Sequence, residues 1–226
     1  HPTSLERSMN EQITLAGEVL VPLASGALLW PRHEMLVFSD LHLGKSERIA
    51  RRGGALLPPY ETDETLSRMA EEIAAHQPRS VLCLGDSFDD RGAADALSER
   101  HRNMITRLQA GREWLWVEGN HDPGPLDLGG THLAEHARTS LTFRHIAKAD
   151  AIPGEVSGHY HPKAQVRMSS RPCFLTDERR LIMPAFGCYT GGLRWTPPAL
   201  RRLFAPRATA YLTGRKVLAV PVPVAA

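Results

Sequence analysis

The chain has 226 residues, of which 42% are hydrophobic and 23% charged, and its formal net charge is +2. This length can bury a core of good size, and the composition is that of a globular protein rather than a disordered one. No stretch approaches the roughly 20 apolar residues of a membrane-spanning helix, and the start of the chain lacks the features of a secretory signal. The three cysteines are unpaired in number and lack metal-binding spacing, which favours a reducing, cytoplasmic location.

We interpret residues 1–8, ahead of Met9, as a remnant of an expression tag, and residues 9–226 as a single domain. Arginine outnumbers lysine 23 to 4 in this chain. The guanidinium fork matches phosphate oxygens, so the bias fits a phosphate-rich partner. A GC-rich genome would produce the same bias, and we give the two explanations equal weight.

Strand and helix signals alternate through the first two thirds of the chain. Leu66, Met69 and Ile73 have the spacing of one helical face, and Gly111 is placed to end a second helix. The expected strands are residues 13–21, 27–30, 35–38, 81–84 and 114–117, and the expected helices are residues 61–76 and 93–110. After residue 130 we expect short hairpin strands at 141–144, 165–168, 173–175 and 181–183, and an edge strand within 217–226. A mixed sheet followed by a more antiparallel one predicts two sheets packed face to face, with helices outside.

Residues that can bind metal recur in five short motifs. These are Asp40-Leu-His42, Gly85-Asp86, Gly119-Asn120-His121-Asp122, His145 and Gly158-His159-Tyr160-His161. Ligands bind beyond the carboxyl ends of strands in sheets with helical crossovers, so the first three motifs are expected to meet at one point. Imidazole, carboxylate and amide groups suit Mn, Fe or Zn, and one carboxylate can bridge two ions roughly 3.5–4 Å apart. On a strand His159 and His161 would share a face, although a turn after Gly158 could equally aim both rings.

From Asp40 to His161 the pattern resembles the calcineurin-like metallophosphoesterase superfamily. Four segments around the ligands make it similar to the bacterial ligase-associated DNA-damage-response endonuclease branch. They are the segments Ser39-Asp40-Leu41-His42-Leu43-Gly44-Lys45 and Gly85-Asp86-Ser87-Phe88, and the sequences around Arg144-His145 and Ser157 to Pro162. The resemblance implies a four-layer αββα sandwich of two mixed β-sheets flanked by helices, and two divalent metal ions, most simply Mn, with Fe or Zn as alternatives.

The resemblance also implies a role for each site residue. It places Asp40, His42, Asp86 and His161 on one metal, and Asp86, Asn120, His145 and His159 on the other, with Asp86 bridging. His145 is the ligand that the residues alone support least, because a lone His ending Leu-Thr-Phe-Arg is as often a surface residue. His121 would protonate the leaving oxygen, with Asp122 orienting its ring. Asp122 could equally be a turn residue before Pro123-Gly124.

Basic residues near the motifs are candidates for phosphate or DNA contacts: Lys45, Arg48, Arg51, Arg52 and Arg144. The expected function is a Mn-dependent DNA endonuclease in DNA repair that prefers single-stranded DNA and attacks in line with a metal-bridging hydroxide. DNA is the expected partner, and DNA-repair proteins such as a ligase or helicase encoded nearby are further partners to test. No membrane partner is expected.

Two other classes stay open. A phosphodiesterase or phosphatase acting on cyclic nucleotides or other small phosphoesters is the main alternative, since no dedicated nucleic-acid-binding motif is visible. An inactive scaffold that binds protein partners is the second, although such scaffolds usually lose ligand histidines that this chain keeps. Protein phosphatases are disfavoured, because Gly-Asp-x-x-Asp-Arg-Gly is one residue longer here and Asp122 stands where those enzymes have Glu.

Overall fold

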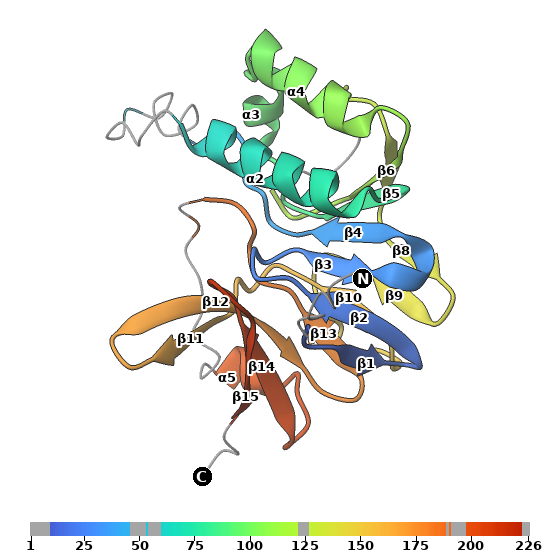
Figure 1. Ribbon diagram of the computed structural model, residues 1–226, viewed down its shortest axis with the longest axis vertical. Coiled ribbons are helices and arrows are strands. Elements are labelled where there is room, and N and C mark those ends of the chain that lie inside the picture. Colours follow the sequence, from blue (N-terminus) through green and yellow to red (C-terminus); the bar gives the residue numbers. More distant parts are fainter. Residues whose placement is uncertain are drawn as a thin grey trace, which may run out of the picture.

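Two β-sheets stack face to face at the centre of the molecule, and helices cover the outer face of the first sheet (Figure 1). The computed structural model describes residues 10–45, 53, 60–121, 127–188, 190 and 198–222. Residues 1–8, interpreted above as a tag remnant, lie outside this part of the chain. Among the described residues, no helix is long and apolar enough to serve as a membrane span.

The first sheet has seven strands in sequence order. They are β1 (Ile13–Leu15), β2 (Glu18–Pro22), β3 (Leu28–Trp30), β4 (Met35–Phe38), β5 (Ser80–Leu84), β6 (Glu113–Val117) and β7 (Thr131–Leu133). Neighbours from β1 to β4 pair antiparallel, and neighbours from β4 to β7 pair parallel. Parallel strands need crossover connections. The helix α2 (Glu61–His76) supplies the first crossover, and α3 (Arg91–Asp95) and α4 (Glu99–Gln109) supply the second.

The second sheet has the order β15-β14-β12-β13-β10-β9-β8, and β11 pairs with β12. Its strands are β8 (His136–Arg138), β9 (Leu141–Phe143), β10 (Glu155–Ser157), β11 (Lys163–Val166), β12 (Ser169–Thr176), β13 (Arg180–Ile182), β14 (Ala208–Leu212) and β15 (Leu218–Val222). Within the described strands of this second sheet, only β9, β10 and β13 pair in parallel. A 3-10 turn, η1 (Pro31–His33), joins β3 to β4, and α5 (Pro198–Arg201) precedes β14.

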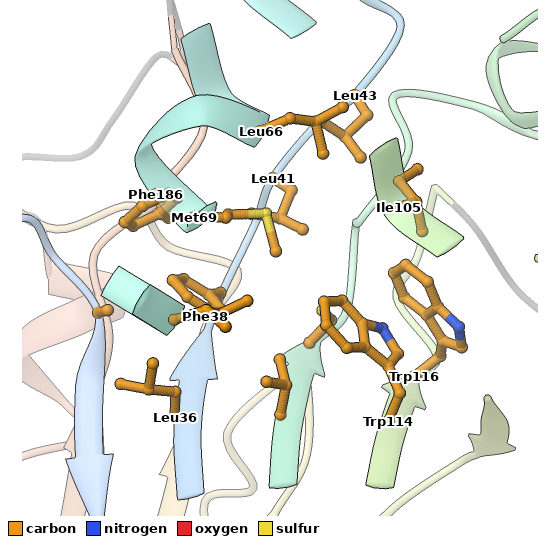
Figure 2. Close-up of a cluster of buried hydrophobic side chains, with 14 of the residues drawn as sticks. Leu36, Phe38, Leu41, Leu43, Leu66, Met69, Ile105, Trp114, Trp116 and Phe186 are labelled. Atoms are coloured by element: carbon orange, nitrogen blue, oxygen red, sulfur yellow. The ribbon is translucent and has the colours of Figure 1, made fainter. Parts of the chain in front are cut away.

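Alternation along the central strands divides the core into layers. Leu36 and Phe38 of β4 face the helices, whereas Met35 and Val37 face the second sheet. Figure 2 shows the helix-facing layer, in which side chains of β4 and β6 pack against Leu66 and Met69 of α2 and Ile105 of α4. Because both faces of these strands are covered, their residues are almost all buried, as the continuous apolar runs predicted.

The structure confirms the two mixed sheets with helices outside. Within the described residues, helical cover on the second sheet is a single turn, α5, whose Leu200 is buried against Cys173, Ile182 and Leu212. The predicted helix at 61–76 and the edge strand near the C-terminus are both present.

Two predicted elements are each divided. The strand expected at 13–21 is two strands, because Ala16 and Gly17 take positive φ values of 48° and 81° and turn the chain. The helix expected at 93–110 is α3 and α4. The hydroxyl of Ser98 accepts a hydrogen bond from His101 N–H at 3.1 Å and starts the second helix afresh.

Candidate metal centre

The predicted ligands follow the ends of strands from both sheets. Asp40 comes two residues after β4, Asp86 two after β5, and Asn120 three after β6. His145 follows β9 and His159 follows β10, which are parallel neighbours in the second sheet. The carboxyl ends of parallel strands meet at one edge of a sheet, so each sheet delivers its donors to the same place.

The backbone is bent sharply at these residues. Of the ten non-glycine residues with positive φ in the described chain, five are predicted ligands: Asp40, His42, Asp86, His159 and His161. Such conformations are costly and persist where surrounding structure enforces them, often at functional sites. The turn after Gly158, rather than a shared strand face, therefore aims His159 and His161.

The first donor cluster consists of Asp40, His42 and His161, whose ligand atoms lie within 4.8 Å of one another. Nε2 of His161 lies 3.1 Å from Asp40 Oδ1 and 3.3 Å from His42 Nε2. Asp40 is fully buried, and its Oδ1 accepts no well-aligned hydrogen bond from any described residue. A buried acceptor facing several imidazole nitrogens needs a cation or a proton between them.

The second cluster consists of Asp86, His145 and His159, again within 4.8 Å. Nε2 of His145 lies 3.1 Å from Asp86 Oδ2 and 3.0 Å from Asn120 Oδ1, and that amide oxygen lies 3.1 Å from His159 Nδ1. The two clusters adjoin, since His145 Nε2 is 3.8 Å from Asp40 Oδ1. The structure therefore brings all seven predicted ligands together, including His145.

Hydrogen bonds behind the imidazoles fix which nitrogen faces the centre. Nδ1 of His145 lies 2.9 Å from the carbonyl oxygen of Leu84, and Nδ1 of His42 lies 3.1 Å from Asp89 Oδ1. Because a carbonyl and a carboxylate only accept, each Nδ1 carries a hydrogen, which leaves Nε2 as the nitrogen through which each ring would bind a metal. This is the arrangement that prepares histidine for metal binding. Sequence reasoning did not single out Asp89 for this role.

The shifted pKa values indicate that the carboxylates of the site need positive charge to balance them. Burial alone would raise the pKa of Asp40, but the neighbouring His161 and His145 lower it below its ordinary value. The pKa of Asp86 is also lowered, because His145 outweighs the effect of burial. Burial would lower the pKa of His145, yet its hydrogen bond to Asp86 and the nearby carboxylates raise it to about 9. Without a metal, a proton on His145 balances the carboxylates, and divalent ions would replace it. The donor set and its orientation fit two such ions.

Three glycines allow the close approaches on which the centre depends. A Cβ on Gly85 would lie 2.3 Å from His145 Nδ1, and one on Gly158 would lie 2.1 Å from Ser39 Oγ. A Cβ on Gly187 would lie 2.1 Å from the carbonyl oxygen of Leu41. Gly187 carried no sequence signal, because its contact is made with a segment far away along the chain.

His121 stands at the exposed rim of the centre. Its backbone N–H donates to Asp86 Oδ1 at 2.8 Å, its Nε2 is 4.0 Å from Asp86 Oδ2, and 47% of its side chain is exposed. That position allows contact with a departing oxygen while keeping the ring outside both donor clusters. Asp122, predicted to orient it, lies outside the described residues.

The predicted phosphate contacts have different outcomes. Lys45 is half-buried, and Arg48, Arg51 and Arg52 lie outside the described residues. Arg144 needs correction. Its Nε lies 3.0 Å from Glu135 Oε1, and another guanidinium nitrogen lies 2.5 Å from Glu155 Oε2. Two carboxylates therefore neutralise the guanidinium, and only 13% of the side chain is exposed. For both reasons we do not retain Arg144 as a phosphate contact.

Comparison with known proteins places this geometry in a family. Residues 34–190 match the family model described as calcineurin-like phosphoesterase. The chain is 29% identical over 154 residues to 3′,5′-cyclic adenosine monophosphate phosphodiesterase CpdA of Pseudomonas aeruginosa. That match covers 66% of this chain and 53% of the relative, so the chain spans about half of the relative's length.

Among solved structures, nuclease MPE of Pseudomonas putida matches with a TM-score of 0.72 and 25% identity, over 94% of this chain and 99% of that one. The phosphoesterase Yfce of E. coli matches with a TM-score of 0.41 and 12% identity, over 84% of this chain and 99% of that one. The match to nuclease MPE confirms the resemblance to the nuclease branch. The family model covers more than half of the chain, and its members use a binuclear divalent metal centre, for which the two donor clusters are candidate ligand sets. The chain belongs to the calcineurin-like phosphoesterase family.

Proposed function

We propose that this protein is a Mn-dependent DNA endonuclease that prefers single-stranded DNA and acts in DNA repair. The observation that supports this most is the agreement with nuclease MPE over nearly the whole of both chains, with both donor clusters intact. The similarity to the cyclic AMP phosphodiesterase, in contrast, extends over about half of that relative.

The seven predicted ligands would form two sets, one for each metal ion. Asp40, His42 and His161 would hold one ion, Asn120, His145 and His159 the other, and Asp86 would be shared. Two divalent ions bound there would stabilise charge on the phosphoryl oxygens and lower the pKa of water from 15.7 towards roughly 7. Mn fits the mixed imidazole and oxygen donors, Fe and Zn are further possibilities, and Mg is a poor match because it favours oxygen ligands.

The chain's own groups supply the rest of the chemistry. Asn120 contributes a neutral oxygen, which limits the negative charge that an incoming phosphodiester meets. His121 would carry the proton for the leaving oxygen on Nε2, and its half-exposed ring leaves room for a strand to enter and depart. Asn120 and His121 are both exposed, so the centre opens to solvent at this rim and a flexible single strand can reach it more easily than a stiff duplex.

The experiment that tests this proposal compares substrates under defined metals. Protein stripped with a chelator is supplied with Mn, Zn, Fe or Mg and incubated with a single-stranded oligonucleotide, its duplex, cyclic AMP and a bis-nitrophenyl phosphate. We expect Mn to support internal cleavage of the single strand faster than of the duplex, with activity falling as salt rises.

An Asp86→Asn variant should lose all cleavage, whereas His76→Ala, at the exposed end of α2, should behave as wild type. Hydrolysis of cyclic AMP with no cleavage of any DNA would instead support the small-phosphoester alternative.

A further inference from the structure

A cavity of about 520 Å³ lies beside residues 185–187, and its walls carry two cations, Arg68 and Lys163. Its wall is tied to the loop that carries Asp40. The backbone N–H of Gly187 donates to the Asp40 carbonyl at 3.2 Å, and that of Phe186 donates to Ser39 at 2.8 Å. Lys163 is the first residue of β11 and follows the ligand His161 by two positions. Two residues of extended chain span at most about 7 Å, so the lysine belongs to the immediate surroundings of the centre.

Arg68 is held in a fixed orientation by neutral partners. Its guanidinium lies 4.2 Å from the centroid of the Phe186 ring, and it donates to the carbonyl oxygens of Phe186 and Ser25, each at 2.8 Å. Figure 2 shows Phe186 beside Met69 and close to Phe38, and the rings of Phe186 and Phe38 are 4.8 Å apart, so the platform beneath the guanidinium is part of the core. These contacts orient the cation without cancelling its charge.

Lys163 has a neutral partner as well. Its Nζ donates to the carbonyl oxygen of Thr190 at 3.3 Å. Within the described part of the chain, neither Lys163 nor Arg68 forms an ion pair with a carboxylate, and the cavity wall contains no Asp or Glu. Two uncompensated positive charges around one solvent-accessible space favour an anion between them.

The side of the centre formed by Asn120 and His145 carries more negative charge. A smaller cavity of about 260 Å³ borders Asn120 and His145, and it is lined by Glu118, Glu135 and the neutralised Arg144. Carboxylates repel a polyanion, so a nucleic-acid strand that reaches the centre is favoured on the side of Arg68 and Lys163.

We propose that Arg68 and Lys163 form a subsite for the backbone phosphate next to the scissile phosphodiester, so that the strand runs from the centre past the start of β11. This inference rests on the proposed nuclease function, because only an oligonucleotide carries a second phosphate. Lysine binds phosphate as a point charge and arginine through its planar fork. Contacts of this kind position the strand without reading bases, which fits a nuclease with little sequence preference.

The test uses substrates that differ by one phosphate. The dinucleotide TpT has only the scissile phosphodiester, whereas TpTpT offers a second phosphate to the subsite. Wild-type protein should show a higher kcat/KM for TpTpT than for TpT, and Lys163→Gln should reduce that ratio several-fold, with Lys163→Arg restoring it. The matched control is Lys148→Gln, because Lys148 is ion-paired to Glu135 on the other flank and its removal should leave the ratio unchanged. Arg68→Lys should reduce the ratio as well, and is preferable to Arg68→Ala because Arg68 also holds backbone carbonyls in place.

A binding measurement without metal gives an independent readout. In chelator, anisotropy of a labelled single-stranded oligonucleotide should show weaker binding to Lys163→Gln. The slope of log K against log salt should be less steep by about 0.7, the value for one lost phosphate contact.

An unchanged ratio together with an unchanged salt slope would overturn the subsite while leaving the nuclease proposal intact. Binding of inorganic phosphate that is lost in Lys163→Gln without any change in the ratio would make it a site for free phosphate, which overturns the strand assignment. Wild-type protein that hydrolyses a nitrophenyl diester but neither oligonucleotide would overturn the nuclease function, and the subsite with it.

Discussion

His121 and Asp86 are neighbours in space that differ in burial, as we expect of a proton donor and a metal ligand respectively. Asp86 is 2% exposed within a donor cluster, whereas the His121 side chain is 47% exposed beside it. We expect His121→Ala to retain both metals and to lose about 10²-fold or more in turnover on DNA, because general acid catalysis contributes on that order. The loss should shrink on a nitrophenyl diester, whose leaving group needs little protonation. Metal analysis by mass spectrometry checks the first expectation, and a depleted variant would make His121 a ligand instead.

Substitution of Gly158 tests how closely the two sheets must approach each other at the metal centre. A Cβ there would lie 2.1 Å from Ser39 Oγ and 2.5 Å from Asp40 Oδ2, so Gly158→Ala should displace Asp40 and bind much less Mn than wild type, with a stability cost of about 1–3 kcal/mol. Gly17→Ala is the control, because its Cβ meets open space and only the positive φ of 81° penalises it, by about 1–2 kcal/mol. Full Mn content together with wild-type stability in Gly158→Ala would contradict this account.

The residues that could be predicted from the sequence are those whose chemistry is local. Six of the seven ligands lie in short motifs of Asp, Asn or His residues, and the family resemblance added His145, so all seven could be proposed before their geometry was known. Asp89 and the Leu84 carbonyl could not, because their role is to hold the far nitrogen of an imidazole from another segment. Arg68 and Lys163 were missed for the same reason, since α2 and β11 meet only in the folded chain.

At the scale of elements, α4 depends on a cap that the sequence analysis overlooked. Ser98 Oγ accepts from His101 N–H at 3.1 Å, and loss of such a cap costs about 1 kcal/mol. We expect Ser98→Ala to lower the free energy of unfolding, measured by urea denaturation, by that amount while leaving metal content and turnover unchanged, because α4 packs on the sheet rather than on the centre. Wild-type stability in Ser98→Ala would show that this hydrogen bond does not stabilise the start of α4.

Element boundaries could be predicted where one periodic pattern has clear ends, as for α2 with its apolar face from Leu66 to Ile73. The Ala-rich run from Ala93 hid the break before α4, because alanine is favourable in both helices and supplies no boundary signal. Gly17 did carry a signal for the turn between β1 and β2, and the apolar alternation on either side masked it.

An ion-pair cluster joins the loop before β8 to the residues after β9, and it makes stability depend on pH. Hydrogen bonds from Arg144 and Lys148 lower the pKa of Glu135 to about 2, from an ordinary value of 4.5. A depressed carboxyl pKa stabilises the fold above the unfolded value, and this stabilisation is lost as pH falls from 4.5 towards 2. The difference in unfolding free energy between wild type and Glu135→Gln should therefore shrink from pH 6 to pH 3. Because Glu135 is 40% exposed, solvent screening keeps the difference below about 1 kcal/mol. A difference that does not vary with pH would exclude this origin.

At the scale of the whole molecule, the two sheets contribute different donor residues to one shared edge. The first sheet delivers Asp40, Asp86 and Asn120 from parallel strands, and the second delivers His145 and His159 (Figure 1). The core between the sheets sets their separation, so the packing of residues such as Val37 and Phe143 determines whether the donors meet. The geometry of the metal centre therefore depends on the packing of both sheets.

The central claim is that this edge holds two metal ions with Asp86 between them. The most direct measurement is anomalous X-ray diffraction from crystals of the protein soaked in Mn. The account predicts two peaks within about 4 Å of each other, one beside Asp40, His42 and His161 and the other beside Asn120, His145 and His159, with Asp86 touching both. A single peak, two distant peaks, or an Asp86 carboxylate in contact with no ion would contradict it.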